Sequence, residues 1–426
     1  MGDDKDKDGL DASGETSDES SPSPAVAADD GKSTAYRGDA PPKPREPKKP
    51  VTLWQRATYR WTAITAVMAT LLVVYTQHPY YLGGQFAPFR PFYTFAFVVW
   101  LALGLFYVRA TLVKFKGTRF TMRDGGLHLL LLGKAFQQKR FWHYAKKPRI
   151  RTTLLGIVVK AFYTPLMIGF FSGHSNNIAE AWLRHKHLPG LKFVLPKGSV
   201  LVQAPAWFEH MRLRLPDLIP SASDFSGLFA FSTWTRGDIG WGLGLAYDLV
   251  FFVDCGWALM GYTLESRWLG NKTRSVEPTA LGWAAALSCY PPYNNVLGTY
   301  LPLENGIQRI TGENALLALR IATVLLFTIY ATATVAFGFK FSNLTNRGIV
   351  SRGPYRLVRH PAYLCKCTAW WLEHLPTITI TKAFFLTLLC GVYALRAWTE
   401  ERHLSKDPEY REYKRKVPWI FIPGVY

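Results

Sequence analysis

Long apolar runs alternate with short polar segments along most of residues 51–400. A helix needs about 20 apolar residues to cross the hydrocarbon core of a bilayer. Runs of this length occur at residues 57–77, 91–113, 153–173, 241–264, 280–301 and 315–339. A shorter run at 363–375 is followed by one at 379–398, which predicts a helical hairpin. The pattern predicts an all-α, polytopic helical membrane protein with about six spanning helices and this C-terminal hairpin.

Two of the predicted spans carry residues that are unusual in a lipid-facing helix. Asp248 and Asp254 lie in the fourth run, and acids inside a membrane usually face a polar cavity or pair with a cation. Pro291 and Pro292 interrupt the fifth run. A broken helix is tolerated where it is buried in protein or lines a cavity, so the fifth segment is expected either to span the bilayer or to re-enter it.

The first fifty residues differ in composition from the rest of the chain. They are rich in Asp, Glu, Ser, Pro and Lys and have almost no large apolar side chains, which is typical of disorder. We therefore divide the chain into a disordered tail at 1–50, a multi-span membrane domain at 51–339 and a C-terminal domain at 340–426.

Basic residues outnumber acidic ones, and the formal net charge is +20. Such a charge also occurs in nucleic-acid-binding proteins, but here the Lys and Arg residues flank the apolar runs, as in cytoplasmic loops. Residues 114–152 contain eleven Lys or Arg and one Asp, so this loop and the N-terminus are expected on the cytoplasmic side. Six crossings then return residue 340 to the cytoplasm. The expected partner is the membrane bilayer and not nucleic acid.

The Cys and His residues form no recognisable metal or disulfide pattern. Cys365 and Cys367 are separated by one residue, whereas zinc and redox pairs usually have two. His185 and His187 have no well-spaced carboxylate beside them. We therefore predict no metal site.

Two blocks of charged and aromatic residues flank the last apolar run. The first is residues 341–363, FSNLTNRGIVSRGPYRLVRHPAY, and the second is residues 396–413, RAWTEERHLSKDPEYREY. Charge beside a membrane helix is costly unless it has partners. Two such blocks around one helix therefore indicate a site.

These blocks resemble the isoprenylcysteine carboxyl methyltransferases and their relatives, the phospholipid N-methyltransferases. The matching pieces are Gly353-Pro354-Tyr355, Arg359-His360-Pro361-x-Tyr363, Arg396-x-x-x-Glu400-Glu401 and Tyr410-x-x-Tyr413 before Val417-Pro418. The resemblance is confined to residues 340–426. It implies an integral membrane enzyme that transfers a methyl group from S-adenosylmethionine to a lipid-like or prenylated acceptor.

The resemblance also implies roles for individual residues. Arg396 is expected to bind the carboxylate of the acceptor and Glu400 the polar end of the methyl donor, so both are predicted catalytic residues. The residues predicted to bind S-adenosylmethionine are Tyr355, Arg359, His360, Pro361, Ala362, Tyr363, Glu400 and Glu401.

The residue types agree with these roles, although each has a simpler interpretation. Pro361 restrains His360 to extended geometry and suits the first turn of a helix, where free N–H groups bind anions. The same Arg-His pair could instead bind lipid phosphate. Arg396 and Glu400 share one face of a helix, and taken alone they would be an ordinary ion pair of roughly 0.3–0.5 kcal/mol.

The acceptor stays open at this point. A carboxylate is already ionised at pH 7, so an aligning Arg would suffice, and carboxyl methylation of a prenylcysteine-type group is the preferred hypothesis. A phospholipid amine would need a proton acceptor, for which Glu400, Glu401 or His360 is available. Two further alternatives are an NADPH-dependent enzyme like the sterol reductases and a non-enzymatic transporter. The oligomeric state is not predicted.

Overall fold

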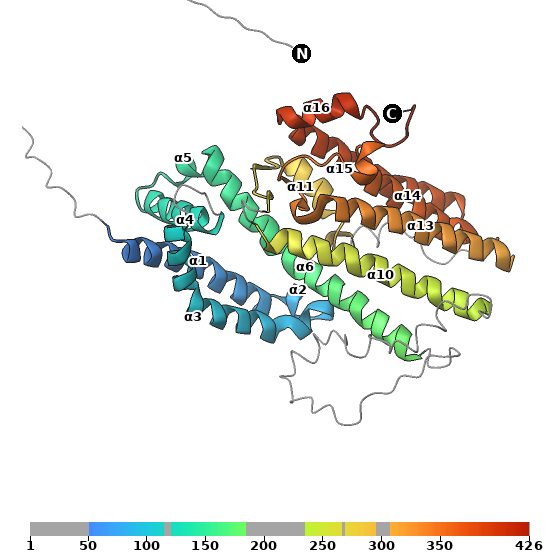
Figure 1. Cartoon of the computed structure of the whole chain (residues 1–426), viewed down its shortest axis with the longest axis horizontal. Helices are drawn as coiled ribbons and strands as arrows, with labels where there is room; N and C mark the ends of the chain where they lie inside the picture. The colour runs from blue at the N-terminus through green and yellow to red at the C-terminus, as the bar shows by residue number, and fades with distance from the viewer. Residues whose placement is uncertain (1–50, 115–120, 185–234, 266–268, 295–306, 426) are drawn as a thin grey trace, which may run out of the picture. The chain divides into compact units, whose positions relative to one another are not determined.

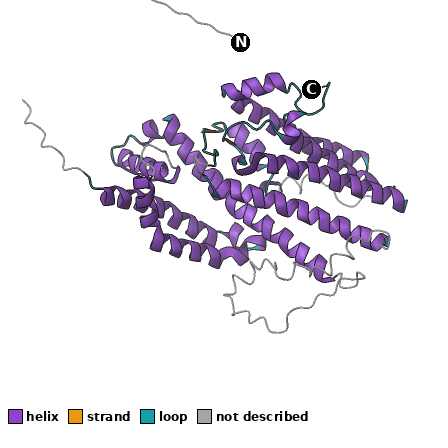
Figure 2. Cartoon of the chain, in the orientation of Figure 1, coloured by secondary structure: helices purple, strands orange, loops and turns teal. Residues whose placement is uncertain are grey.

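Helices make up nearly all of the regular structure in the computed structural model (Figure 2), which describes residues 51–114, 121–184, 235–265, 269–294 and 307–425. The helices are α1 (Leu53–Gln77), α2 (Pro79–Leu82), α3 (Arg90–Lys114), α4 (Thr121–Gln137), α5 (Phe141–Ala145), α6 (Pro148–Arg184), α10 (Arg236–Thr263), α11 (Ala280–Leu287), α13 (Glu313–Phe337), α14 (Pro361–His374), α15 (Ile380–Leu404) and α16 (Pro408–Lys416). Two short strands, β1 (Ser275–Val276) and β2 (Thr345–Asn346), pair antiparallel. The predicted tail at 1–50 lies outside the described residues.

Six of the described helices are long and apolar enough to cross a membrane, namely α1, α3, α6, α10, α13 and α15 (Figure 1). Large apolar side chains stay exposed on their outer faces, such as Phe95, Leu103 and Phe106 of α3. Exposed apolar surface of this extent is expected where lipid tails replace water. The prediction of an all-α, multi-pass integral membrane protein is confirmed.

The ends of α10 show that it runs parallel to its neighbour α13. Arg236 and Glu313, the first residues of the two helices, form an ion pair. At the other end, Gly261 of α10 lies against the backbone of Phe341, which follows α13 closely in the chain. The chain between the two helices must therefore return from one end of the helical unit to the other.

This return involves the fifth apolar run, for which the sequence left open a span or a re-entrant segment. Of the run at 280–301, the described part is an eight-residue α11 followed by turns, and eight helical residues extend only about 12 Å. Pro291 and Pro292 remove two backbone donors, which stops the helix. The segment arrives at the opposite end by Arg309, whose N–H donates to the carbonyl of Pro376 at 2.7 Å. Residues 295–301 lie outside the described residues.

The C-terminal hairpin is confirmed. Helices α14 and α15 pack together and are joined by a short 3₁₀ turn, Leu375–Thr377. Helix α15 is long enough to cross the membrane, whereas α14 has fourteen residues. The described residues from Val51 onward form one compact unit, and the predicted domain border at residue 340 lies inside it.

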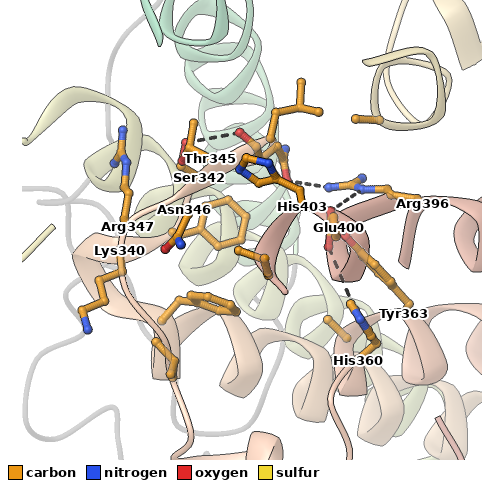
Figure 3. Close-up of a pocket in the computed structure, with 18 of the residues that line it drawn as sticks. Lys340, Ser342, Thr345, Asn346, Arg347, His360, Tyr363, Arg396, Glu400 and His403 are labelled. Atoms are coloured by element: carbon orange, nitrogen blue, oxygen red, sulfur yellow. Dashed lines mark hydrogen bonds and ion pairs between the residues drawn. The ribbon is translucent and has the colours of Figure 1, made fainter. Parts of the chain in front are cut away.

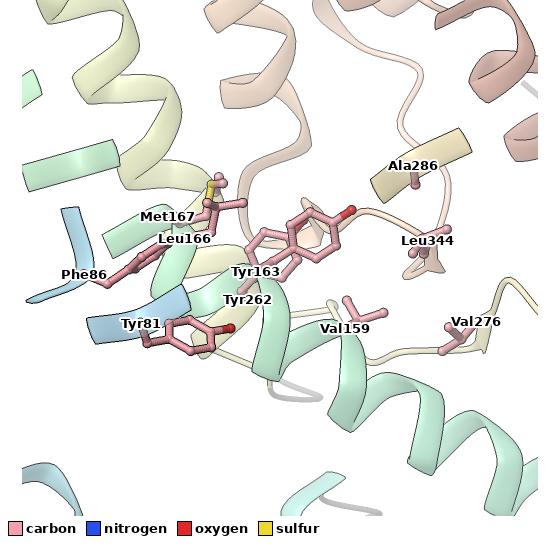
Figure 4. Packing of buried hydrophobic residues seen from close by; sticks show 11 residues of the cluster. Tyr81, Phe86, Val159, Tyr163, Leu166, Met167, Tyr262, Val276, Ala286 and Leu344 are labelled. Atoms are coloured by element: carbon pink, nitrogen blue, oxygen red, sulfur yellow. The ribbon is translucent and has the colours of Figure 1, made fainter. Parts of the chain in front are cut away.

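The buried core of this unit holds the loop that begins the first motif block (Figure 4). Tyr163 of α6 stacks on Tyr262 of α10 with ring centroids 5.1 Å apart and planes 6° from parallel. The hydroxyl oxygen of Tyr262 accepts a hydrogen bond from the backbone N–H of Asn343 at 3.0 Å. Pairing of β1 with β2 fixes the next residues of the same loop, Thr345 and Asn346. The membrane helices therefore set the position of residues 343–346.

A buried ion cluster fastens α6 to the same loop. Glu265 accepts from the Lys160 ammonium at 2.6 Å and lies 3.8 Å from the Arg347 guanidinium. Burial would raise the pKa of Glu265, but the two cations outweigh it and lower the pKa from 4.5 to about 2. Lys160 is thus an ion-pair partner inside the protein and does not reach for the lipid headgroups.

We predict that Glu265→Gln lowers stability and removes one source of its pH dependence. Because the folded-state pKa is below the unfolded value, the carboxylate stabilises the fold above about pH 4.5, by about 3 kcal/mol. That contribution is lost as the pH falls toward 2. Thermal unfolding in detergent between pH 3 and pH 7 measures it, with the exposed Glu412→Gln as control. An acid-side decline equal in Glu265→Gln and wild type would contradict the prediction.

Candidate active site at the ends of α14 and α15

A small polar cavity, of about 150 Å³, lies where the end of α13, the loop after it, the start of α14 and the end of α15 meet (Figure 3). We call it the polar cavity. The predicted site residues that line it are Tyr355, Arg359, His360, Ala362, Tyr363, Arg396 and Glu400. The two motif blocks therefore come together in space around one cavity.

Arg396 is a buried cation of the polar cavity, with an acidic and an amide side chain as partners. Its Nε donates to Glu400 Oε1 at 3.1 Å, and its Nη2 donates to Asn343 Oδ1 at 2.5 Å. The guanidinium carbon also lies 5.1 Å from the ring centre of Tyr363 and 5.6 Å from that of Tyr290. A guanidinium buried in this way is stable only because every side of it has a polar or aromatic partner.

Glu400 remains accessible from the polar cavity, with a quarter of its side chain exposed. One carboxylate oxygen, Oε1, accepts from both the Tyr363 hydroxyl at 2.6 Å and Arg396. The other oxygen, Oε2, lies 4.0 Å from His360 Nδ1. A carboxylate with one anchored oxygen and one less engaged oxygen is well placed to receive a cation from the cavity.

Glu401 has a different environment from its neighbour. It does not line the polar cavity, and it binds Arg359 through Nε at 2.5 Å and Nη2 at 3.3 Å. The Lys414 ammonium at 2.9 Å and the Tyr410 hydroxyl at 3.2 Å complete its partners. These contacts give Glu401 a structural role, whereas the sequence suggested a contact with the donor.

Arg359 extends this cluster to the end of the chain. Its Nη1 donates to the carbonyl oxygens of Val417 and Pro418 at 3.0 and 2.7 Å, while its backbone N–H donates to Trp419. We call Arg359, Glu401 and these carbonyls the C-terminal clamp. The clamp holds the last segment against the start of α14. Pro361 begins that helix and, like Glu401, is not among the cavity-lining residues.

His360 connects the C-terminal clamp with the polar cavity. Its ring stacks on Tyr363 with centroids 5.4 Å apart and planes 13° from parallel. Its Nε2 atom is buried, 3.5 Å from Glu401 Oε1, and has no hydrogen-bond partner among the described residues. Nδ1, which lies 4.0 Å from Glu400 Oε2, is therefore the ring nitrogen on the side of the cavity-lining acid.

Several residues of the polar cavity were not predicted as site residues. Asn343 holds Arg396 and is itself bonded to the Tyr290 hydroxyl at 3.0 Å. Its only sequence signal was its place in a polar stretch before the first motif. Lys366 also lines the cavity. Its ammonium nitrogen lies 5.2–5.6 Å from the ring centres of Tyr330, Trp370 and Tyr393.

The two intramembrane acids both have partners on other helices. Asp248 binds His174 of α6 at 2.9 Å, and Asp254 accepts from the Tyr330 hydroxyl at 3.1 Å. Among the described residues no group of His, Cys, Asp or Glu side chains is suited to a metal ion. His185 and His187 lie outside the described residues.

The polar cavity offers the groups that S-adenosylmethionine requires. Glu400 suits its cationic amino group, His360 is a donor for its carboxylate, and the rings of Tyr355 and Tyr363 are walls for its base. The volume is smaller than the roughly 300–1,000 Å³ of typical ligand pockets. The residues thus fit the donor chemically, and binding requires the side chains around Arg396 to move apart.

We predict that Arg359→Ala loosens the C-terminal clamp. Glu401 would stay buried with Lys414 as its remaining cation, and breaking a buried ion pair costs roughly 3–5 kcal/mol. The unfolding temperature should fall, and residues 417–425 should become cleavable by protease. Arg356→Ala is the matched control because Arg356 lies three residues away and is exposed. Equal protease resistance in the two variants would show that the clamp does not hold this segment.

Comparison with known proteins gives a family match for the C-terminal part of the chain. No curated protein and no solved structure matches the chain. Residues 305–417 match a family described as protein of unknown function (DUF1295). This segment of the 426-residue chain contains most of the residues that line the polar cavity.

Proposed function

We propose that the protein is an S-adenosylmethionine-dependent membrane methyltransferase whose acceptor is lipid-like and most readily a carboxylate. The observation that carries this proposal is the arrangement of Tyr363, Arg396 and Glu400 at the wall of the polar cavity. An accessible acid, a buried guanidinium and aromatic rings are the groups that a cationic donor and an anionic acceptor need together.

The aromatic lining favours a positively charged ligand. Tyr290, Tyr330, Tyr363 and Tyr393 all border the polar cavity, and tyrosine rings attract cations through their negative faces. Glu400 adds a full negative charge beside them. The cavity therefore supports binding of a molecule that carries both an ammonium and a sulfonium group.

When bound, S-adenosylmethionine supplies a methyl group whose transfer to a carboxylate oxygen breaks a C–S bond, forms a C–O bond and leaves a neutral thioether. Arg396 orients the acceptor carboxylate, and Asn343 and Glu400 hold Arg396 in place. A carboxylate acceptor carries no proton that must be removed. The protein therefore has to orient the donor and the acceptor and exclude water from them. Burial of Arg396 provides the water-poor surroundings.

We also propose that the polar cavity opens toward the cytoplasm. The basic segment at 114–152 leads into α6, and cytoplasmic loops are enriched in Lys and Arg. The loop after α10 and the loop after α13 meet at β1 and β2, on the same end of the helical unit as the start of α6. A water-soluble donor would reach the cavity from that side.

A second candidate is NADPH binding, which one observation favours. Arg274 Nη2 and Lys340 Nζ both lie 3.2 Å from the position that a Cβ on Gly348 would occupy. Gly348 has φ +102°, a conformation that side chains other than hydrogen rarely adopt. Arg274 is already paired with Asp407 and Glu409, so Lys340 and the glycine backbone are the groups that would bind a phosphate, such as the 2′-phosphate of NADPH.

Calorimetric titration of the detergent-purified chain with S-adenosylmethionine tests the main proposal. We expect binding in the micromolar range and a 10- to 100-fold loss in Glu400→Gln, because a hydrogen bond to a charged group contributes about 1.5–3 kcal/mol. Glu412→Gln, on the exposed face of α16, should bind like the wild type. Absence of binding by folded wild-type protein would overturn the methyltransferase proposal.

The same titration with NADPH separates the two candidates. If the protein is a methyltransferase, NADPH should bind at least tenfold more weakly than S-adenosylmethionine, and Lys340→Ala should leave donor affinity within about twofold of wild type. Tight NADPH binding that Lys340→Ala weakens would favour the reductase-like alternative, since that change removes a phosphate-binding cation.

A further inference from the structure

A second and much larger cavity lies beside the polar cavity. It has a volume of about 1230 Å³ and is enclosed by α1, α4, α6 and the segment between α10 and α11. We call it the large cavity. Most of these elements precede residue 305, so the segment that matches a known family does not form them. A space of this size exceeds that of typical small-molecule pockets, roughly 300–1,000 Å³, and suits a molecule with a long chain.

Two helices give the large cavity an apolar lining. Ile64, Val67 and Leu71 line it from α1, and Leu155 and Ile157 line it from α6. These side chains offer no hydrogen bonds, so they would contact a hydrocarbon chain and not a polar solute.

The mouth of the large cavity is basic. Arg149 and Arg151 come from the first turn of α6, Lys272 from the segment before β1, and Lys406 from the turn after α15. Within the described part of the chain, no ion pair or side-chain hydrogen bond engages these four cations. The acids at this cavity are already neutralised, because Glu265 is paired with Lys160 and Asp407 with Arg274.

A thin wall separates the large cavity from the polar cavity. Asn346 and His403 line both of them. His403 Nε2 lies 3.1 Å from the Ser275 hydroxyl, and Asn346 Nδ2 donates to Asp407 Oδ2 at 2.8 Å. The second ring nitrogen of His403, Nδ1, is buried without a hydrogen-bond partner among the described residues. A head group at the basic mouth would therefore lie next to the wall of the donor site.

We propose that the large cavity binds an anionic lipid, with its hydrocarbon chain between α1 and α6 and its acidic head group on Lys272, Lys406 and the two arginines. The inference that this lipid is the methyl acceptor rests on the proposed function. The inference that the cavity binds an anionic lipid does not. The shared head-group chemistry is a negatively charged oxygen acid, either a carboxylate or a phosphate. The bilayer supplies both kinds.

Binding of radiolabelled oleate and of radiolabelled phosphatidic acid to the full purified chain tests the proposal and distinguishes the two head groups. Phosphatidylcholine, which carries no net charge, is the control ligand. The double variant Lys272→Glu/Lys406→Glu should weaken binding of the preferred anionic lipid at least tenfold, whereas Arg356→Glu, an exposed change outside both cavities, should not. Binding of phosphatidylcholine as tight as that of both anionic lipids would overturn the proposal.

A cavity-filling variant locates the hydrocarbon chain. Gly156 lines the large cavity, and the nearest neighbour of a Cβ placed there is Val276 Cγ2 at 4.0 Å. Gly156→Leu should therefore fold normally, with an unfolding temperature at least equal to that of the wild type, and bind anionic lipid at least tenfold more weakly. Unchanged lipid affinity in Gly156→Leu would show that the hydrocarbon chain does not lie in the large cavity.

Titration of the same variants with S-adenosylmethionine keeps this inference separate from the proposed function. Loss of lipid binding with retained donor binding is the expected result. A wild-type protein that binds anionic lipid but no donor would keep the lipid site and overturn its assignment to the acceptor. A wild-type protein that binds donor but no anionic lipid would overturn the present inference alone.

Discussion

The burial of the Arg396 guanidinium is the constraint around which the C-terminal part of the protein is organised. A buried ion is tolerated only when partners replace its hydration, and here those partners come from different parts of the chain. Asn343 reaches Arg396 from the loop after α13, while Glu400 lies one turn further along α15. Tyr363 of α14 contributes its ring to Arg396 and its hydroxyl to Glu400. The same contacts that neutralise the charge therefore define the wall of the polar cavity.

The membrane helices upstream contribute to this site through the loop that they hold. The stacked rings of Tyr163 and Tyr262 form part of the main core, and the Tyr262 hydroxyl receives the Asn343 backbone N–H. The cluster of Lys160, Glu265 and Arg347 connects α6 to the same loop. Substitutions in α6 or α10 should consequently alter the contacts of Arg396, although neither helix supplies a residue predicted for the site.

The two cavities divide polar and apolar chemistry between two parts of one unit. The polar cavity is built mainly from α13 to α16, whereas the large cavity is built mainly from α1, α4 and α6. The pair of short strands lies at the wall between them, because Asn346 of β2 lines both cavities and Ser275 and Val276 of β1 line the large cavity. The pairing of β1 with β2 involves only two residues of each strand. In the proposed reaction it holds the wall between the water-soluble methyl donor and the membrane-soluble acceptor.

The sequence by itself determined the helical membrane architecture, because apolar runs of spanning length leave few other folds. It also determined the two motif blocks and the hairpin between them. Local spacing already indicated the pair of Arg396 and Glu400, one helical turn apart, but tertiary structure alone decided that Glu401 pairs with Arg359, just before α14. It likewise brought Asn343 and Lys366 to the polar cavity and limited the described helix of the fifth segment to the short α11. Local spacing shows which residues share a helix face, but contacts between distant segments depend on how whole helices pack.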